Sequence, residues 1–187
     1  MFARGKSNLL AEIEDRRSVL SEMIERFPNL IKDEIANFEM LMDKEAKEAA
    51  EGDIDIEISC RANSMYYSVI DYKYDVLTCH YYSLCLMIYA YAESLVTRIS
   101  LEVNPIKKKL KGNYLEGHYQ RIKSKYPRLP KLKAIWNDKD SIQKNRNMIA
   151  HQLKSQDVTI TQEYLTRNLE SAYNLLCTIE KEINRTT

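Results

Sequence analysis

The chain has 187 residues, of which 44% are hydrophobic and 29% are charged, which suits one domain with a hydrophobic core and excludes a wholly disordered protein. Only four glycines and four prolines are present, which excludes an all-β fold with many tight turns and favours long helices with short connections. The formal net charge of +1 conceals an acidic region at residues 1–60, with 8 Lys/Arg and 15 Asp/Glu, and a basic region at residues 107–146, with 13 Lys/Arg and 3 Asp/Glu.

Two helices are predicted in the first 50 residues. Apolar residues between Leu9 and Ile24 recur at helical spacing, which predicts a helix over about residues 7–26. Pro28 either breaks this helix or begins the next one, because proline is unfavourable inside a helix but suits its first turn. The second helix is predicted to run from about residue 28 to residue 50.

An alternating segment separates these helices from the rest of the chain. Residues 51–53 read as a helix stop, and Ile54, Ile56 and Ile58 then alternate with acidic residues, as in a strand. Since no obvious partner strand follows, we predict an extended linker at this point.

The most apolar part of the chain follows. Residues 62–103 are predicted to form one long helix or two in sequence, and residues 81–101 are apolar on nearly every side, as in a helix at the middle of a bundle. Many of the 13 tyrosines lie here, which fits an amphipathic interior or a dimer interface. Asn104 and Pro105 are predicted to end this element.

The C-terminal half predicts three further helices. A short helix around Tyr114–Tyr126 lies within the basic region, and Trp136 is expected to be a packing anchor. The next helix begins near Asp138 or Asp140, whose carboxylates suit a helix N-terminus. Apolar residues at helical spacing predict a last helix over about residues 161–183.

Neither a disulfide framework nor a metal site is indicated. The four cysteines include no C-x-x-C pair, and His80 and His118 lack partners at ligand spacing, so we expect no metal and no cofactor. The N-terminus has no apolar signal core, and the most apolar run, residues 81–92, is shorter than the roughly 20 residues that cross a bilayer. We therefore expect a reduced, cytoplasmic protein without membrane contact.

The residues that indicate chemistry lie in one segment, Lys144-Asn145-Arg146-Asn147-Met148-Ile149-Ala150-His151. Its arginine, the polar residue after it and its histidine resemble the R-x4-6-H motif of HEPN domains, here with the spacing R-x4-H. The context is similar too, because the motif lies on the predicted penultimate helix. The long apolar helix before it carries Glu93, which resembles an acidic residue often seen on an early core helix of these domains. The resemblance covers about residues 65–185.

The resemblance implies an all-α, HEPN-like helical bundle over residues 61–187, preceded by an acidic helical extension, residues 1–60, that packs with it as one unit. Many HEPN domains are metal-independent endoribonucleases of toxin–antitoxin, abortive-infection and other host-defence systems. They form homodimers in which two motifs share one cleft, and they leave a 2′,3′-cyclic phosphate and a 5′-hydroxyl. RNA, a second copy and an antitoxin or defence-system protein are therefore the expected partners.

These residue types suit that chemistry. RNA supplies its own nucleophile, the ribose 2′-hydroxyl, so the enzyme needs a base and an acid, and histidine titrates near neutrality. His151 is the candidate acid or base, Arg146 would stabilise the charged transition state, and Asn147 would orient the phosphate or His151. Glu93 is a candidate support for Arg146. RNA contacts are predicted at Lys107, Lys108, Lys109, Lys111 and Lys144.

Other interpretations of the same residues stay open. Arg146 and His151 point about 140° apart on an ideal helix, so His151 lies at a frayed helix end, or the arginine curls round, or two subunits share the site. Without the resemblance, His151 would be interpreted as an ordinary helix-terminal histidine and Arg146 as a surface cation. The basic region would then be interpreted as a solvated surface. The alternative functions are a non-catalytic HEPN-like module that binds nucleotide, RNA or protein, and an interaction subunit that holds a partner through residues 1–50.

Overall fold

The structure is a computed structural model that describes residues 6–52, 54–103, 105, 114–151 and 160–186. Of the described residues 91% are helical and none lies in a strand, which confirms the predicted all-α fold. The described residues form six helices: α1 (Lys6–Glu51), α2 (Ile56–Val103), α3 (Tyr114–Lys125), α4 (Leu132–Ile135), α5 (Lys139–His151) and α6 (Gln162–Thr186).

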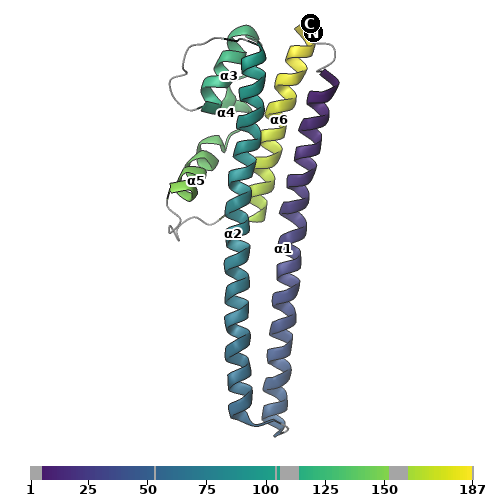
Figure 1. Ribbon diagram of the computed structural model, residues 1–187, viewed down its shortest axis with the longest axis vertical. Helices are drawn as coiled ribbons and strands as arrows, with labels where there is room; N and C mark the ends of the chain where they lie inside the picture. Colours follow the sequence, from purple (N-terminus) through teal and green to yellow (C-terminus); the bar gives the residue numbers. More distant parts are fainter. Residues whose placement is uncertain (1–5, 53, 104, 106–113, 152–159, 187) are drawn as a thin grey trace.

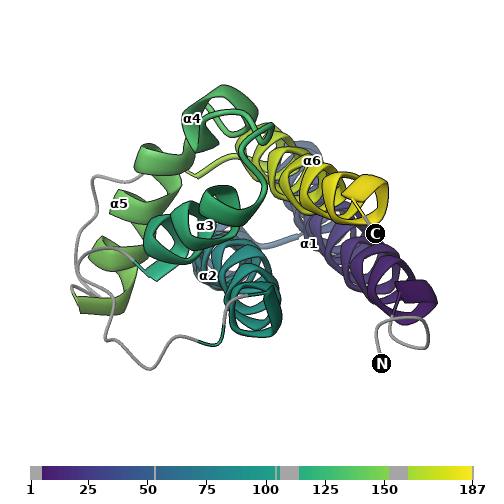
Figure 2. The same cartoon turned by 90° about the horizontal axis from the view of Figure 1, so that it is seen from above.

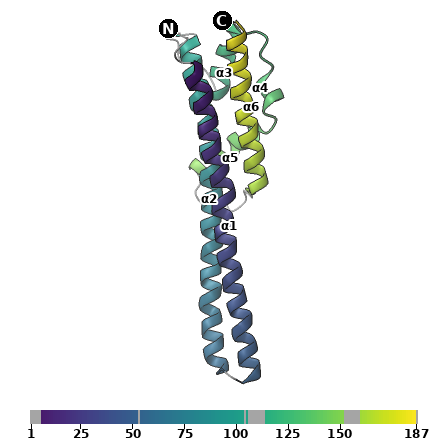
Figure 3. The ribbon, with the colours of Figure 1, turned by 90° about the vertical axis from the view of Figure 1, so that its right-hand side faces the viewer.

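Helices α1 and α2 run antiparallel along the whole length of the molecule (Figure 1). Helix α6 packs along their upper halves, and α3 and α5 pack on the side of α2 that faces away from α1 (Figure 2). The lower halves of α1 and α2 project beyond the other helices as a pair (Figure 3). We call this pair, residues 27–51 of α1 and 56–80 of α2, the stalk, and the remainder the bundle.

The main core lies in the bundle and draws on all the long helices. Ile13, Leu84, Ile122, Ile142 and Leu175 come from five different helices, and all have no exposed surface. The N-terminal half of α1 thus shares one core with α2, α3, α5 and α6. A second, smaller core in the stalk contains the buried side chains Ile31, Ile35, Ile70 and Leu77.

Pro28 lies inside α1, so the prediction that it separates two helices was wrong. Proline in a helix interior removes one backbone hydrogen bond and costs about 3 kcal/mol. Pro28 is buried where α1 passes from the bundle to the stalk, and His80 of α2 contacts α1 beside it. His80 Nε2 lies 2.9 Å from the Met23 carbonyl oxygen, and its ring centroid lies 4.2 Å from that of Phe27. Packing against α2 on both sides of the proline keeps the helix continuous.

The predicted extended linker after residue 53 was also wrong, because α2 begins at Ile56. Asp55 caps this helix: its Oδ1 accepts a hydrogen bond of 2.7 Å from the Glu57 backbone N–H, and its carbonyl accepts one of 3.0 Å from Ser59 N–H. The alternation of isoleucine and acid therefore does not reflect a strand. On the helix, Ile56 and Ile58 are instead 70% and 62% exposed.

The remaining predicted elements agree with the structure. Helix α2 is one helix that ends at Val103, and α3, α5 and α6 lie within a few residues of the predicted ranges. The short helix α4 was not predicted. By length and composition α2 would also suffice to cross a membrane, which the sequence analysis of the shorter run at residues 81–92 did not indicate. However, 56% of the most apolar 18-residue segment of α2 is buried within the fold.

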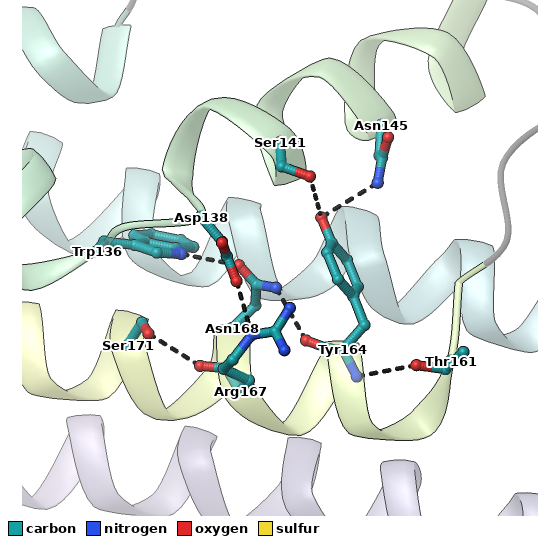
Figure 4. Close-up of polar contacts among 9 residues, drawn as sticks. All are labelled: Trp136, Asp138, Ser141, Asn145, Thr161, Tyr164, Arg167, Asn168 and Ser171. Carbon is teal, nitrogen blue, oxygen red and sulfur yellow. Dashed lines mark hydrogen bonds and ion pairs between the residues drawn. The ribbon is translucent and has the colours of Figure 1, made fainter.

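Trp136 is a buried anchor, as predicted. It has no exposed surface, and its Nε1 donates a hydrogen bond of 2.8 Å to Asn168 Oδ1 on α6 (Figure 4). Asn168 Nδ2 in turn donates to the Tyr164 carbonyl oxygen at 2.8 Å. The Trp136 ring also packs against Tyr89 of α2, with ring centroids 6.5 Å apart. Trp136 therefore joins the segment before α5 to both α2 and α6.

We expect Asn168→Ala to lower the free energy of unfolding by about 1–3 kcal/mol, because it leaves the buried indole N–H without its partner. Urea unfolding followed by the fluorescence of Trp136, the one tryptophan of the chain, measures the change. Asn174 is exposed on the same helix, so Asn174→Ala is the matched control. Its free energy of unfolding should stay within about 0.5 kcal/mol of the wild-type value. Equal losses in the two variants would show that the buried hydrogen bond contributes nothing specific.

Candidate active site on helix α5

Polar contacts with α6 hold helix α5 in place (Figure 4). Tyr164 Oη lies 3.3 Å from Ser141 Oγ and accepts a hydrogen bond of 3.1 Å from Asn145 Nδ2. Just before α5, Asp138 accepts a hydrogen bond of 2.7 Å from Arg167 Nε. Two of these contacts meet at the Tyr164 hydroxyl, and the third joins the segment before α5 to α6. Together they fix the orientation of α5, and with it the positions of the motif residues.

Arg146 is half-buried and lies against α2. Its guanidinium carbon is 5.6 Å from the centroid of the Tyr89 ring, which is a cation–π contact. Its Nη1 also donates a hydrogen bond of 3.0 Å to Oδ1 of the neighbouring Asn147. A guanidinium carries several N–H donors in a rigid plane, so these two contacts orient the group and use only part of its hydrogen-bonding capacity.

Glu93 lies one turn after Tyr89 on α2 and interacts with the same arginine. Burial raises the pKa of the Glu93 carboxyl above its ordinary value, and the nearby charge of Arg146 offsets part of this rise. The interaction between these two described side chains is coulombic. Glu93 therefore does not use the hydrogen-bond donors of Arg146.

The structure brings Arg146, Asn147 and Glu93 together, as the sequence-based hypothesis requires. Helix α5, as described, ends at His151, while the side chain of that residue lies outside the described part of the structure. Lys144 is exposed on α5, two residues before Arg146. The predicted RNA contacts at Lys107, Lys108, Lys109 and Lys111 also lie outside the described residues.

Tyr89 is a site residue that the sequence analysis assigned only to the apolar helix. It is 2% exposed, and it contacts both Trp136 and the Arg146 guanidinium. One signal in the sequence could have identified it, because Tyr89 and Glu93 are four residues apart and so share a helix face.

The arrangement suits the binding of a phosphate group. An arginine that is always charged, planar and held on an aromatic ring is well suited to a phosphodiester oxygen. Within the described residues, no group of three or more His, Cys, Asp or Glu side chains is placed to hold a metal ion.

No known protein family, curated protein or solved structure matches this chain. Its function must therefore be argued from the residues of the site and their geometry.

The raised pKa of Glu93 predicts a pH-dependent effect of Glu93→Gln on stability. As pH rises from about 4.5, the ordinary value of a glutamate, the unfolded chain releases this proton before the folded chain does. The folded state then binds more protons, so wild-type stability falls relative to Glu93→Gln until the pH exceeds the raised pKa. Urea unfolding of both proteins between about pH 4 and pH 8 measures the difference. A difference that does not change with pH would show that burial of Glu93 leaves its pKa unaltered.

Proposed function

We propose that this protein is a metal-independent endoribonuclease of the toxin or host-defence type, which cuts RNA at the α5 site. The observation that carries the proposal is the placement of Arg146 by Tyr89, Asn147 and Glu93. Five residues later α5 reaches His151, about 7.5 Å further along the helix axis. The resemblance of Arg146, Asn147 and His151 to the HEPN motif supports the same function.

In the proposed reaction, His151 takes the proton of a ribose 2′-hydroxyl, whose oxygen attacks the adjacent phosphorus. The bond between phosphorus and the 5′-oxygen of the next nucleotide breaks, and that oxygen accepts a proton from a second acid. If two copies share a cleft, the partner subunit's His151 supplies this proton. The products are a 2′,3′-cyclic phosphate and a 5′-hydroxyl, so neither an activated water nor a metal ion takes part.

Arg146 has the electrostatic role in this reaction. Negative charge accumulates on the phosphate oxygens in the transition state, and fixed donors that are already oriented stabilise it without further reorganisation. Tyr89 and Asn147 provide that orientation. Because Glu93 acts on Arg146 only through charge, the N–H donors of the arginine that Asn147 does not use remain for the substrate.

The basic region supports binding of a polyanion. Residues 107–146 include α3, α4 and part of α5, which lie on the same side of α2 (Figure 2). Exposed basic side chains here include Arg128, Lys131, Lys133 and Lys144. Such a surface concentrates RNA near the site through contacts with its phosphates, whatever the base sequence.

A second candidate function is a non-catalytic module that binds RNA or a partner protein. The observation that favours it is the stalk, which projects from the bundle and exposes large apolar side chains such as Met65 and Tyr72. In this case Arg146 would bind a phosphate without turning it over. RNA binding without cleavage at any pH would favour this function over the nuclease.

We expect the wild-type protein to cut RNA in the presence of a chelator and to leave cyclic-phosphate ends. His151→Ala should lower the cleavage rate about 10²–10⁴-fold, the usual contribution of general acid–base catalysis. Arg146→Ala should lower it about 10²–10³-fold, because transition-state charge loses its donor. End-group analysis and single-turnover rates on total cellular RNA measure both effects.

Arg185→Ala is the matched control, because Arg185 is exposed on α6 and lies outside both the α5 site and the basic region. Helical circular dichroism confirms that each variant is folded. Cleavage by His151→Ala at the wild-type rate would exclude this site, and cleavage that stops on chelation would exclude the metal-independent reaction.

We expect the lysines of residues 107–111 to contribute to RNA binding only through contacts between their charges and RNA phosphates. Replacement of Lys107, Lys108, Lys109 and Lys111 by alanine should weaken RNA binding equally for different sequences. It should also reduce the slope of log K against log salt by about 0.7 for each phosphate of single-stranded RNA that the variant no longer neutralises. Fluorescence anisotropy with labelled RNA at several salt concentrations measures the slope. An unchanged slope would show that the run does not contact RNA.

A further inference from the structure

The stalk has a small core and a large apolar surface. Only four of its apolar side chains form the buried core, whereas many others remain exposed on the same two helices. A pair of helices gains most of its stability from packing of apolar faces. Among the described residues, the exposed large apolar side chains of the stalk are Leu30, Met40, Leu41, Ile56, Ile58, Met65, Tyr67, Tyr72 and Tyr74.

Helix α2 carries two parallel rows of residues along the stalk, each with the alternating spacing of four and three that is typical of coiled coils. The first row packs on α1: Tyr66 donates to Glu45, Lys73 contacts Glu34, and His80 contacts Met23. It consists of Ser59, Asn63, Tyr66, Ile70, Lys73, Leu77 and His80. The second row, which we call the outer seam, consists of Ile58, Ala62, Met65, Val69, Tyr72, Val76 and Cys79.

The outer seam is the more apolar of the two rows, although it is the more exposed. Ile58, Met65 and Tyr72 are 62%, 71% and 64% exposed, while the row against α1 contains a serine, an asparagine and a lysine. The two rows are offset by one residue, which is about 100° around the helix. A helix with two packing rows at this angle is suited to two neighbouring helices, as in a bundle. In the stalk, α1 is one neighbour, and the second does not come from the described part of this chain.

The bundle shows what a second neighbour of α2 looks like. The next positions of the outer seam in the same repeat are Ser83, Leu86, Ala90 and Glu93, of which Leu86 and Glu93 are half-buried and Ser83 and Ala90 are exposed. At this level α5 lies against α2, through the contact of Arg146 with Tyr89 and its interaction with Glu93. The outer seam therefore continues, toward the tip of the stalk, a face of α2 that α5 covers in part in the bundle.

We propose that a second copy of the chain occupies the outer seam, with the two α2 helices antiparallel. In a pair centred between Met65 and Val69, Ala62 of each copy lies opposite the partner's Tyr72, so a small side chain faces a large one. Met65 then lies opposite the partner's Val69, and Ile58 opposite the partner's Val76. Both copies use the same seam residues in equivalent contacts, as a two-fold axis requires.

Charges beside the seam match this arrangement. Arg61 and Asp75 lie two heptads apart and so flank the seam on the same side of α2. In the antiparallel pair, Arg61 of each copy lies opposite the partner's Asp75, and symmetry repeats the contact. Arg61 is 78% exposed as a side chain and pairs only with Glu57 of its own helix among the described contacts, so it is accessible to a partner.

The lengths of the elements also favour this occupant. In the antiparallel pair the start of the partner's α2 is level with Thr78, more than two helical turns before Tyr89 and α5. A parallel pair would instead place both α5 helices at the same level, where each occupies the face that the other α2 needs. Ile58, Met65 and Tyr72 of each copy supply most of the buried area, at about 100 Å² each, whereas the half-buried Ala62, Val69 and Val76 add less. The pair therefore buries less than the roughly 1,200 Å² of a standard interface, and we expect it to associate weakly.

This dimer does not depend on the proposed nuclease activity. It places the two α5 sites at opposite ends of the assembly, so a cleft shared by two sites would need a separate contact between chains. Loss of the dimer and loss of cleavage are thus independent results.

Sedimentation equilibrium of the full chain from about 1 µM to about 1 mM tests the proposal. The wild type should reach twice the 22.0 kDa of one chain, and Met65→Glu should weaken association at least about 100-fold, because each copy would bury a charge in the seam. Ser64→Glu, on the exposed polar face of the same helix, is the control and should still dimerise. Circular dichroism verifies that both variants retain their helix content.

A charge exchange tests the identity and direction of the partner. Arg61→Glu and Asp75→Arg should each weaken the dimer, and the variant that carries both should recover it, because opposite charges again face each other. Arg61→Glu and the double variant both remove the intrahelical ion pair with Glu57, so recovery reports only the pairing between copies.

Three results would overturn the proposal. A wild type that stays monomeric over the whole range would exclude a second copy on the seam. A dimer that Met65→Glu leaves intact would place the interface elsewhere. Failure of the double variant to recover association would exclude the antiparallel arrangement.

Discussion

The burial of the upper half of α2 is the interaction on which the rest of this structure depends. From Leu84 to Val103 the buried side chains of this helix face several directions. Helices α1, α6, α3 and α5 cover them, while Met87 and Leu101 stay exposed. The position of α5 therefore follows from the need to cover α2, and the contact of Arg146 with Tyr89 follows from the position of α5.

The lower half of α2 meets the same requirement only in part. In the stalk, α1 covers one row of residues, and Ile58, Met65 and Tyr72 of the outer seam remain exposed, with Met65 71% accessible. The proposed active site therefore lies where several helices pack on α2, and the candidate interface lies where only α1 does. One helix thus connects the two proposed properties, although each can be present without the other.

Periodicity in the sequence predicted the all-α fold and the ranges of most helices, because apolar residues at helical spacing directly reflect the faces that become buried. It failed at Pro28 and at Ile56, where local signals for a break and for a strand were overridden by packing of α1 on α2 and by the Asp55 cap. The sequence pattern also indicated Arg146, Asn147 and Glu93 as neighbours. It could not show that Tyr89 lies beneath the arginine, because that contact joins segments more than 50 residues apart and depends on the packing of the whole bundle.

The central claim is that the α5 site cuts RNA by using the 2′-hydroxyl of the substrate. The most direct test compares an RNA oligonucleotide that the protein cuts with the same oligonucleotide carrying one 2′-deoxynucleotide on the 5′ side of the scissile phosphate, both in the presence of a chelator. If the 2′-hydroxyl is the nucleophile, cleavage at this phosphate is abolished while other positions are still cut. Cleavage of the deoxy-substituted position at an undiminished rate would contradict the central claim, because the nucleophile would then have to come from elsewhere.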